Sequence, residues 1–158
     1  MAVSSGSAAS ANDVLGLASA QHRGRLYAAS QTVATASWVK VQVSSEAFDK
    51  GNIADPTNYK ITTDTAGWWA FGASLATDSF SAAHTTKIAI TNADASPTTS
   101  NTLVQHSYPT GTGVHGHTMS DFQYIDASVP LYLWYQFDAS TSHGINTMAL
   151  WAYLVTAV

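Results

Sequence analysis

The 158-residue sequence has no cysteine and few charged residues, and both absences narrow the possible functions. Without cysteine there is no disulfide framework, no thiolate nucleophile and no cysteine-ligated zinc site. Charged residues make up 10% of the chain, against about 25% in an average soluble domain. The net charge is −4, and no lysine or arginine follows Lys87. Nucleic acid is therefore not an expected partner, because phosphate contacts supply most nonspecific affinity.

The sequence also lacks a long hydrophobic run. Its longest mostly apolar stretch runs from Val129 to Phe137, far below the ~18 residues that a membrane span needs. No basic segment followed by an apolar segment opens the chain. We therefore expect neither a membrane association nor export by a signal peptide.

The first 24 residues differ in composition from the rest of the chain. They are rich in Ser, Ala and Gly, with one apolar patch formed by Val14, Leu15 and Leu17. Such a composition buries too little apolar surface to become ordered alone. We predict that residues 1–24 form a flexible N-terminal arm that anchors the protein through this patch, and that residues 25–158 form a single domain.

The remaining sequence has a β pattern throughout. Short runs rich in Val, Ile, Thr, Tyr, Phe and Trp alternate with Gly, Pro, Asn, Asp and Ser clusters, which is typical of an antiparallel sandwich. The expected strands are Leu26–Val33, Trp38–Val43, Tyr59–Thr63, Trp68–Thr77, Lys87–Thr91, Thr102–Ser107, Thr118–Tyr124, Pro130–Phe137 and Thr147–Val155. The predicted fold class is all-β.

The last two expected strands are apolar on both faces, whereas a half-solvated strand should alternate apolar with polar residues. In the expected strand Pro130–Phe137, one face is apolar, and Tyr132 and Trp134 make the other face apolar as well. In Thr147–Val155, Trp151 and Tyr153 do the same. Another subunit would cover such strands, so these four residues are predicted to form a subunit interface. The alternative is that they are central strands whose amphipathic Tyr and Trp tips reach solvent.

Several short motifs resemble the jelly-roll head shared by complement component 1q and tumour necrosis factor relatives. They are Ala36 to Val43, Phe48-Asp49, Tyr59 to Thr63, and Ala66-Gly67 followed by the aromatic run Trp68 to Phe71. Nearer the C-terminus the element order agrees, but Asp126 to Pro130 lacks the Gly-Asp pair usual in the family. The resemblance implies a jelly roll of about ten strands that assembles as a homotrimer.

Heads of this type also occur in bacteriophage virions, and this small, cysteine-free chain with an arm resembles that group. The expected function is a non-enzymatic virion structural protein, either a capsid decoration or a head or tail fibre module, bound to other virion proteins. The alternative is a receptor-binding or glycan-binding head for a host surface. An enzyme is not expected, because there is no Gly-X-Ser-X-Gly motif and Glu46 is the only glutamate.

Histidine is the remaining chemistry-bearing residue type. His115 and His117 would share one face of an extended segment and could share a metal ion. The alternative is a polar loop rim after Gly111-Thr-Gly113, and no other cofactor is expected. The other histidines are scattered along the sequence without an assigned role: His22, His84, His106 and His143.

Overall fold

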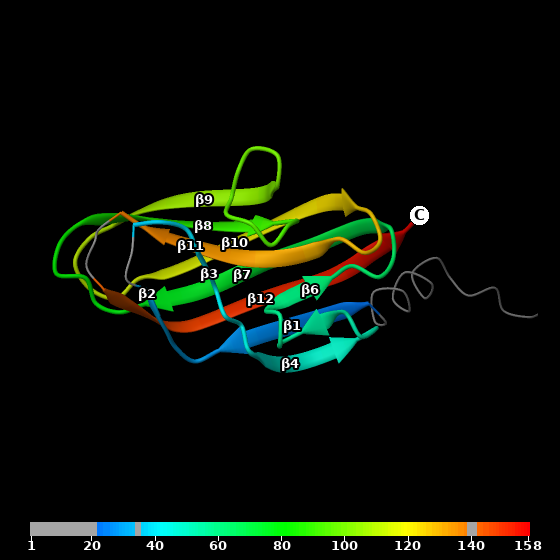
Figure 1. Cartoon of the computed structure of the whole chain (residues 1–158), viewed down its shortest axis with the longest axis horizontal. Coiled ribbons are helices and arrows are strands. Elements are labelled where there is room, and N and C mark those ends of the chain that lie inside the picture. Colours follow the sequence, from blue (N-terminus) through cyan, green and yellow to red (C-terminus); the bar gives the residue numbers. More distant parts are fainter. Residues whose placement is uncertain (1–21, 34–35, 139–141) are drawn as a thin grey trace, which may run out of the picture.

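The computed structural model describes residues 22–33, 36–138 and 142–158, and these residues form two antiparallel β-sheets packed face to face (Figure 1). Sheet A has the order β10-β7-β12-β1-β4, and β2 also pairs with β12. Its strands are β1 (Arg23–Ala28), β2 (Gln31–Val33), β4 (Ser45–Lys50), β7 (Gly67–Thr77), β10 (Gly116–Ile125) and β12 (His143–Ala157).

Sheet B has the order β5-β6-β11-β8-β9, and β3 also pairs with β11. Its strands are β3 (Val39–Lys40), β5 (Ala54–Asp55), β6 (Lys60–Thr62), β8 (His84–Thr91), β9 (Thr102–Thr110) and β11 (Pro130–Phe137). Sequence neighbours therefore often lie in opposite sheets, as in a jelly roll.

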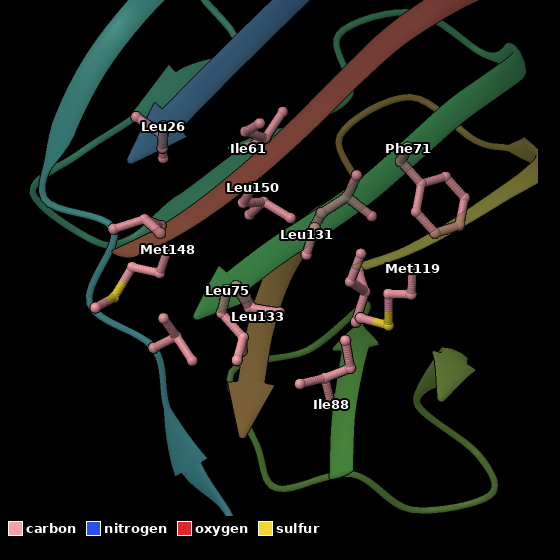
Figure 2. Close-up of a cluster of buried hydrophobic side chains, with 14 of the residues drawn as sticks. Leu26, Ile61, Phe71, Leu75, Ile88, Met119, Leu131, Leu133, Met148 and Leu150 are labelled. Carbon is pink, nitrogen blue, oxygen red and sulfur yellow. The ribbon is translucent and has the colours of Figure 1, made fainter. Parts of the chain in front are cut away.

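The hydrophobic core lies between the two sheets. In β1 the residues alternate between exposed and buried, so that Leu26 points inward while Arg25 points to solvent. Figure 2 shows Leu26, Leu75 and Leu150 of sheet A meeting Ile61, Ile88, Leu131 and Leu133 of sheet B. Full burial of one such side chain contributes about 1.5 to 3 kcal/mol. The prediction of an all-β antiparallel sandwich is thereby confirmed.

The boundaries of the sandwich differ in places from the expected ones. β11 spans Pro130–Phe137 as expected, whereas β4 and β5 were not predicted. Both flank a tight turn in which Gly51 and Asn52 have positive φ values of 93° and 58°. β1 begins at Arg23, so Arg23 and Gly24 pair within sheet A rather than forming the end of the arm.

The arm itself, with Val14, Leu15 and Leu17, lies outside the described residues. Across the part of the chain that the structure describes, no helix is long and apolar enough to cross a membrane.

Candidate functional site

Exposed aromatic side chains gather on the outer face of sheet A, which we call the aromatic face. Among the described residues, every aromatic side chain classed as exposed belongs to this face: Tyr27, Phe48, Trp68, Phe122, Tyr124 and Tyr153, each 42% to 51% exposed. Trp151, half-buried, lies among them. A soluble monomer rarely leaves so large an apolar patch in water.

The strand register explains how one face collects these side chains. Residues directly opposite one another in neighbouring strands point to the same side of a sheet. Phe48 lies opposite Arg25, Arg25 opposite Trp151, and Trp151 opposite Gly72. One row of side chains thus crosses four strands of sheet A.

Gly72 makes room for the Trp151 ring within that row. A Cβ atom built on Gly72 would lie 2.5 Å from a ring carbon of Trp151. The indole therefore lies across the glycine, and its ring stacks on Tyr153 with centroids 5.7 Å apart. This close approach holds Trp151 flat against the sheet.

A second aromatic group occupies the β7–β10 edge of the same face. Trp68 stacks on Phe122 with centroids 5.3 Å apart and meets Tyr124 edge-on at 6.2 Å. β10 is the outermost strand of sheet A on this side. A partner that contacts these rings could therefore also reach the outward backbone edge of β10.

Beside Trp151 the face is hollowed, where Ala47, Ser74 and Ala149 carry small side chains. Three shallow hollows of about 510, 500 and 360 Å³ meet at Ser74. The largest is lined by Phe48, Trp151 and Tyr153 together with Arg23 and Arg25. The Arg23 guanidinium lies 5.7 Å from the centre of the Phe48 ring, so it adds positive charge while packing on an aromatic face.

Of the four predicted interface residues, Trp151 and Tyr153 lie on the aromatic face, but Tyr132 and Trp134 do not. The latter two lie on β11 in sheet B, and they are only 6% and 7% exposed within the single chain. No other subunit is needed to cover them. Their burial within the chain removes the reason for placing Tyr132 and Trp134 in an interface.

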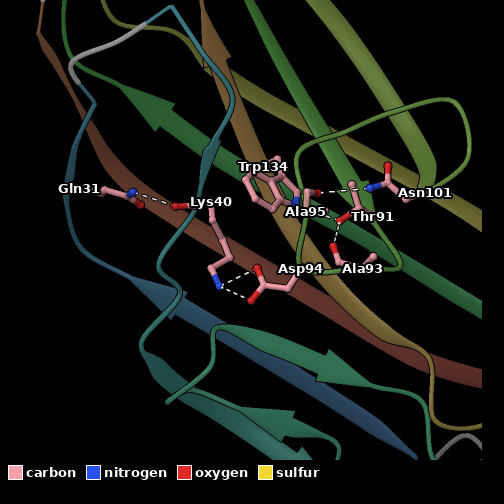
Figure 3. A network of polar contacts seen from close by, with 8 residues as sticks. All are labelled: Gln31, Lys40, Thr91, Ala93, Asp94, Ala95, Asn101 and Trp134. Atoms are coloured by element: carbon pink, nitrogen blue, oxygen red, sulfur yellow. Dashed lines mark hydrogen bonds and ion pairs between the residues drawn. The ribbon is translucent and has the colours of Figure 1, made fainter.

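The cover of Tyr132 and Trp134 comes from β3 and from the loop between β8 and β9. Trp134 Nε1 donates to Thr91 Oγ1 at 2.9 Å, and Lys40 Nζ binds the Asp94 carboxylate at 2.8 Å (Figure 3). Lys40 Nζ also lies 5.3 Å from the Tyr132 ring centre. Burial raises the pKa of the Tyr132 hydroxyl, and the nearby Asp94 adds to this.

The predicted metal pair, His115 and His117, has its rings stacked 6.3 Å apart. His117 is 4% exposed, and its Nε2 lies 3.1 Å from Thr86 Oγ1. His115 Nε2 lies 2.9 Å from the Gly111 carbonyl oxygen. In residues 22–33, 36–138 and 142–158 no group of three His, Asp or Glu side chains could hold a metal ion. One ring nitrogen of each histidine is already used within the chain.

Sequence reasoning missed five members of the aromatic face: Tyr27, Phe48, Trp68, Phe122 and Tyr124. Phe122 and Tyr124 share one parity in β10, while His117 and Met119 share the other and are buried. That alternation was visible in the sequence. On its own, however, this alternation indicates only a half-buried strand. The strand register is needed to show that neighbouring strands place their aromatic residues on the same side.

Comparison with solved structures identifies the fold. The chain is similar to Eiger, a tumour necrosis factor from S. frugiperda, with a TM-score of 0.62 at 10% identity, over 87% of this chain and 94% of that one. It is similar to the globular domain of zebrafish complement 1qA (TM-score 0.57, 7% identity, 87% and 99% covered). Murine APRIL gives a TM-score of 0.55 at 6% identity, with 84% and 99% covered.

Neither a protein-family model nor a curated protein sequence matches the chain. The likeness is therefore one of fold: the chain shares the jelly-roll architecture of these three structures.

Proposed function

We propose, from the jelly-roll fold and its aromatic face, that this protein is a non-enzymatic virion structural protein that acts as a homotrimer. In this proposal it is a bacteriophage capsid decoration or a head or tail fibre module. The observation that carries the proposal is the concentration of exposed aromatic side chains on the outer face of sheet A. Burying such a face between copies of the chain removes it from water.

A closed ring of three copies fits this face better than a face-to-face dimer. One aromatic group, on β7 and β10, lies at one edge of the face, whereas the hollows at Ser74 lie beside the other group, on β12, β1 and β4. In a head-to-tail ring, one side of each copy meets the other side of the next. The projecting Trp68, Phe122 and Tyr124 would then enter the hollow beside Arg25 of the neighbouring copy.

The virion role is supported by composition and by the family resemblance. The chain carries little charge and much Ser and Thr, and large like charges would make densely arrayed trimers repel one another. Occupation of an assembled shell stabilises that shell, because a ligand that binds only the intact form shifts its equilibrium. No step of this function requires turnover of a substrate.

The proposal is tested with two glutamate variants of exposed or half-buried serines. Ser74→Glu places a carboxylate where the three hollows of the aromatic face meet. The matched control, Ser107→Glu, places one on β9 of sheet B opposite Lys87. We expect Ser74→Glu to be a folded monomer that particles do not take up, and Ser107→Glu to behave like the wild type.

Particles with and without the protein are then heated. A lower rupture temperature in its absence supports a stabilising decoration, and an unchanged one contradicts it. Release of sugar or peptide products from host envelopes would overturn the non-enzymatic assignment.

Attachment through residues 1–24 remains a part of the proposal. Because His22 already contacts Asp64 at 2.7 Å and its carbonyl accepts from Leu154 N, the informative deletion removes residues 2–21 only. The shortened chain should trimerise but fail to bind particles. Normal incorporation would contradict an anchoring arm.

A glycan-binding head is the second candidate, and the largest hollow favours it. Phe48, Trp151 and Tyr153 line that hollow, and aromatic rings with a polar edge pack well on sugars. The two candidates differ in what occupies the hollow. Saturable binding on a glycan array that Trp151→Ala abolishes, without a change in oligomeric state, would favour the glycan.

A further inference from the structure

Three histidines far apart in the sequence meet around two phenylalanines at one end of the sandwich. Phe80 stacks on Phe137 with centroids 4.9 Å apart, and it contacts the rings of His84, His115 and His143 at 5.3 to 5.7 Å. The His143 ring lies 4.0 Å from Phe137. This end, where β12 begins, is opposite the end at which the chain terminates, on the left in Figure 1.

The surroundings of His143 favour its neutral form. Its Nε2 lies 2.8 Å from the hydroxyl of Tyr135, which is itself fully buried. Its Nδ1 is buried and has no hydrogen-bond partner among the described residues. A neutral ring needs only one donor, whereas a protonated ring carries two N–H groups. Protonation would leave a buried N–H without an acceptor, which is costly.

The charged groups around His143 do not provide that acceptor. The Asp78 charge acts on the ring, but no hydrogen bond joins the two, and its Oδ2 accepts from Gly144 N at 2.8 Å. Asp138 Oδ2 accepts from Thr85 N at 2.8 Å, and its Oδ1 lies 3.2 Å from His84 Nδ1. β2, which pairs with this end of β12, contributes the uncharged Gln31, Thr32 and Val33.

Burial and the neighbouring charges shift the pKa of His143 in opposite directions. Burial is the largest effect and lowers the pKa of His143; the Asp78 charge raises it, and the neighbouring His84 lowers it. The net direction is downward from the ordinary value of 6.5. Tyr135 does not supply a negative charge, because burial raises the pKa of its hydroxyl.

Few backbone hydrogen bonds hold the segment around Phe80 at this end of the sandwich. Phe80 forms an isolated bridge with Gly113, in which each backbone N–H donates to the other's carbonyl at 2.9 Å. Asp78 N donates to the Gly144 carbonyl at 2.8 Å. A single bridge with a ring stack opens more easily than a long ladder, so we expect local opening at this end.

We propose that this cluster is an acid-sensitive latch, in which protonation of His143 releases the segment around Phe80 while the two sheets stay paired. Opening exposes the rings of Phe80 and Phe137 at one end of the molecule and lets water solvate the charged imidazole. The latch is independent of the proposed assembly, because none of its rings belongs to the aromatic face.

The sign of the effect follows from linkage. The closed form holds His143 neutral, so the open form binds more protons below pH 6.5. The closed form is fully favoured above that pH. As the pH falls from there toward the lowered pKa, the opening equilibrium constant rises about tenfold per pH unit, for one proton taken up.

Hydrogen exchange of the full chain, followed by NMR between pH 7.5 and 5, tests the latch. The protection factors of the Phe80 and Gly113 amides should be constant above pH 6.5 and should then fall by up to tenfold per pH unit. Amides in the middle of β12 should stay better protected than these two at every pH, because they exchange only when the sheets separate. Equal protection of the Phe80, Gly113 and β12 amides, or no change at Phe80 and Gly113, would overturn the proposal.

Two variants assign the effect to one imidazole. His143→Gln keeps an amide near the Nε2 position but cannot take up a proton, so its protection factors should stay flat with pH. The matched control, His106→Gln, alters an exposed histidine on β9 and should keep the wild-type slope. A wild-type slope in His143→Gln would overturn the proposal.

If His143→Gln does not fold, the imidazole resonances of the wild-type protein decide the matter. His143 should titrate with a midpoint below 6.5, together with the loss of protection at Phe80. A midpoint at or above 6.5 would contradict a neutral, buried His143.

Discussion

At the scale of single residues, the two tryptophans of the last two strands have opposite surroundings. Trp134 is 7% exposed, and its indole N–H is satisfied by Thr91. Trp151 lies over Gly72 on the aromatic face, half-buried and beside Tyr153. Their sequence contexts are similar, because both strands are apolar on both faces. Only the neighbouring chain segments distinguish them.

Alanine substitutions at these two positions should therefore separate folding from assembly. Trp134→Ala should lower the free energy of unfolding by ~3 to 5 kcal/mol, through the cavity it leaves, without changing the subunit contact. Trp151→Ala should weaken trimer association by ~2 kcal/mol or more per contact and change chemical denaturation of the subunit less. Sedimentation and denaturant titration of both variants give the two readouts. Trimers of unchanged stability in Trp151→Ala would place Trp151 in solvent.

His117 is a structural residue within the described chain. The Thr86 hydroxyl donates to the Tyr108 carbonyl at 3.4 Å and so accepts from His117 Nε2 at 3.1 Å. Burial, with the nearby His115, lowers the pKa of His117. Thr86→Val would leave this buried N–H unpaired and should cost about 1 to 3 kcal/mol of unfolding free energy. An unchanged midpoint in urea would show that water replaces Thr86.

Acid should also weaken the whole fold, through His117 and His143 together. Both have lowered pKa values in the folded chain, so stability is full above pH 6.5 and declines as the pH falls. Each contributes at most ~1.4 kcal/mol per pH unit in that window. Melting temperatures measured from pH 8 to 5 should be constant at first and then decrease. An increase toward pH 5 would contradict the neutral state of both rings.

At the scale of elements, periodicity predicted the long strands and failed at the short ones. β7, β10, β11 and β12 alternate or are apolar over at least eight residues, and all were expected. β4 reads Ser-Glu-Ala-Phe-Asp-Lys, with four exposed residues. Its pairing with β1 comes from sheet context, because an edge strand buries too little to show a pattern. The packing of the Lys40 segment against β11 could not be predicted from the sequence either, because the two segments are distant in sequence.

Asp49 shows how β4 is held to β5 across the turn. Its carboxylate accepts from Ile53 N at 2.9 Å and from Ala54 N at 3.1 Å. Asp49→Ala should lower the unfolding free energy by about 1 to 3 kcal/mol, because two backbone donors lose their acceptor. Glu46→Ala on the same strand is the control and should change it by less than about 0.5 kcal/mol. Equal effects of the two substitutions would contradict this role for Asp49.

At the scale of the whole molecule, the two outer faces of the sandwich differ in kind. On sheet B the chain covers Tyr132 and Trp134 with Trp38, with Lys40 of β3 and with the loop around Asp94. On sheet A the exposed aromatic face includes a hollow at Ser74, which Arg23 and Arg25 help to line. The sequence indicated an uncovered apolar surface, but its location required the fold. A second copy of the chain is the cover that we propose.

The mass of the purified wild-type chain in solution tests this account most directly. Sedimentation equilibrium at micromolar concentration should give three times the chain mass, with no monomer. The same measurement on Ser74→Glu should give the monomer mass, since a carboxylate would be buried in the contact. A wild-type protein that stays monomeric would contradict the claim that the outer face of sheet A joins the subunits.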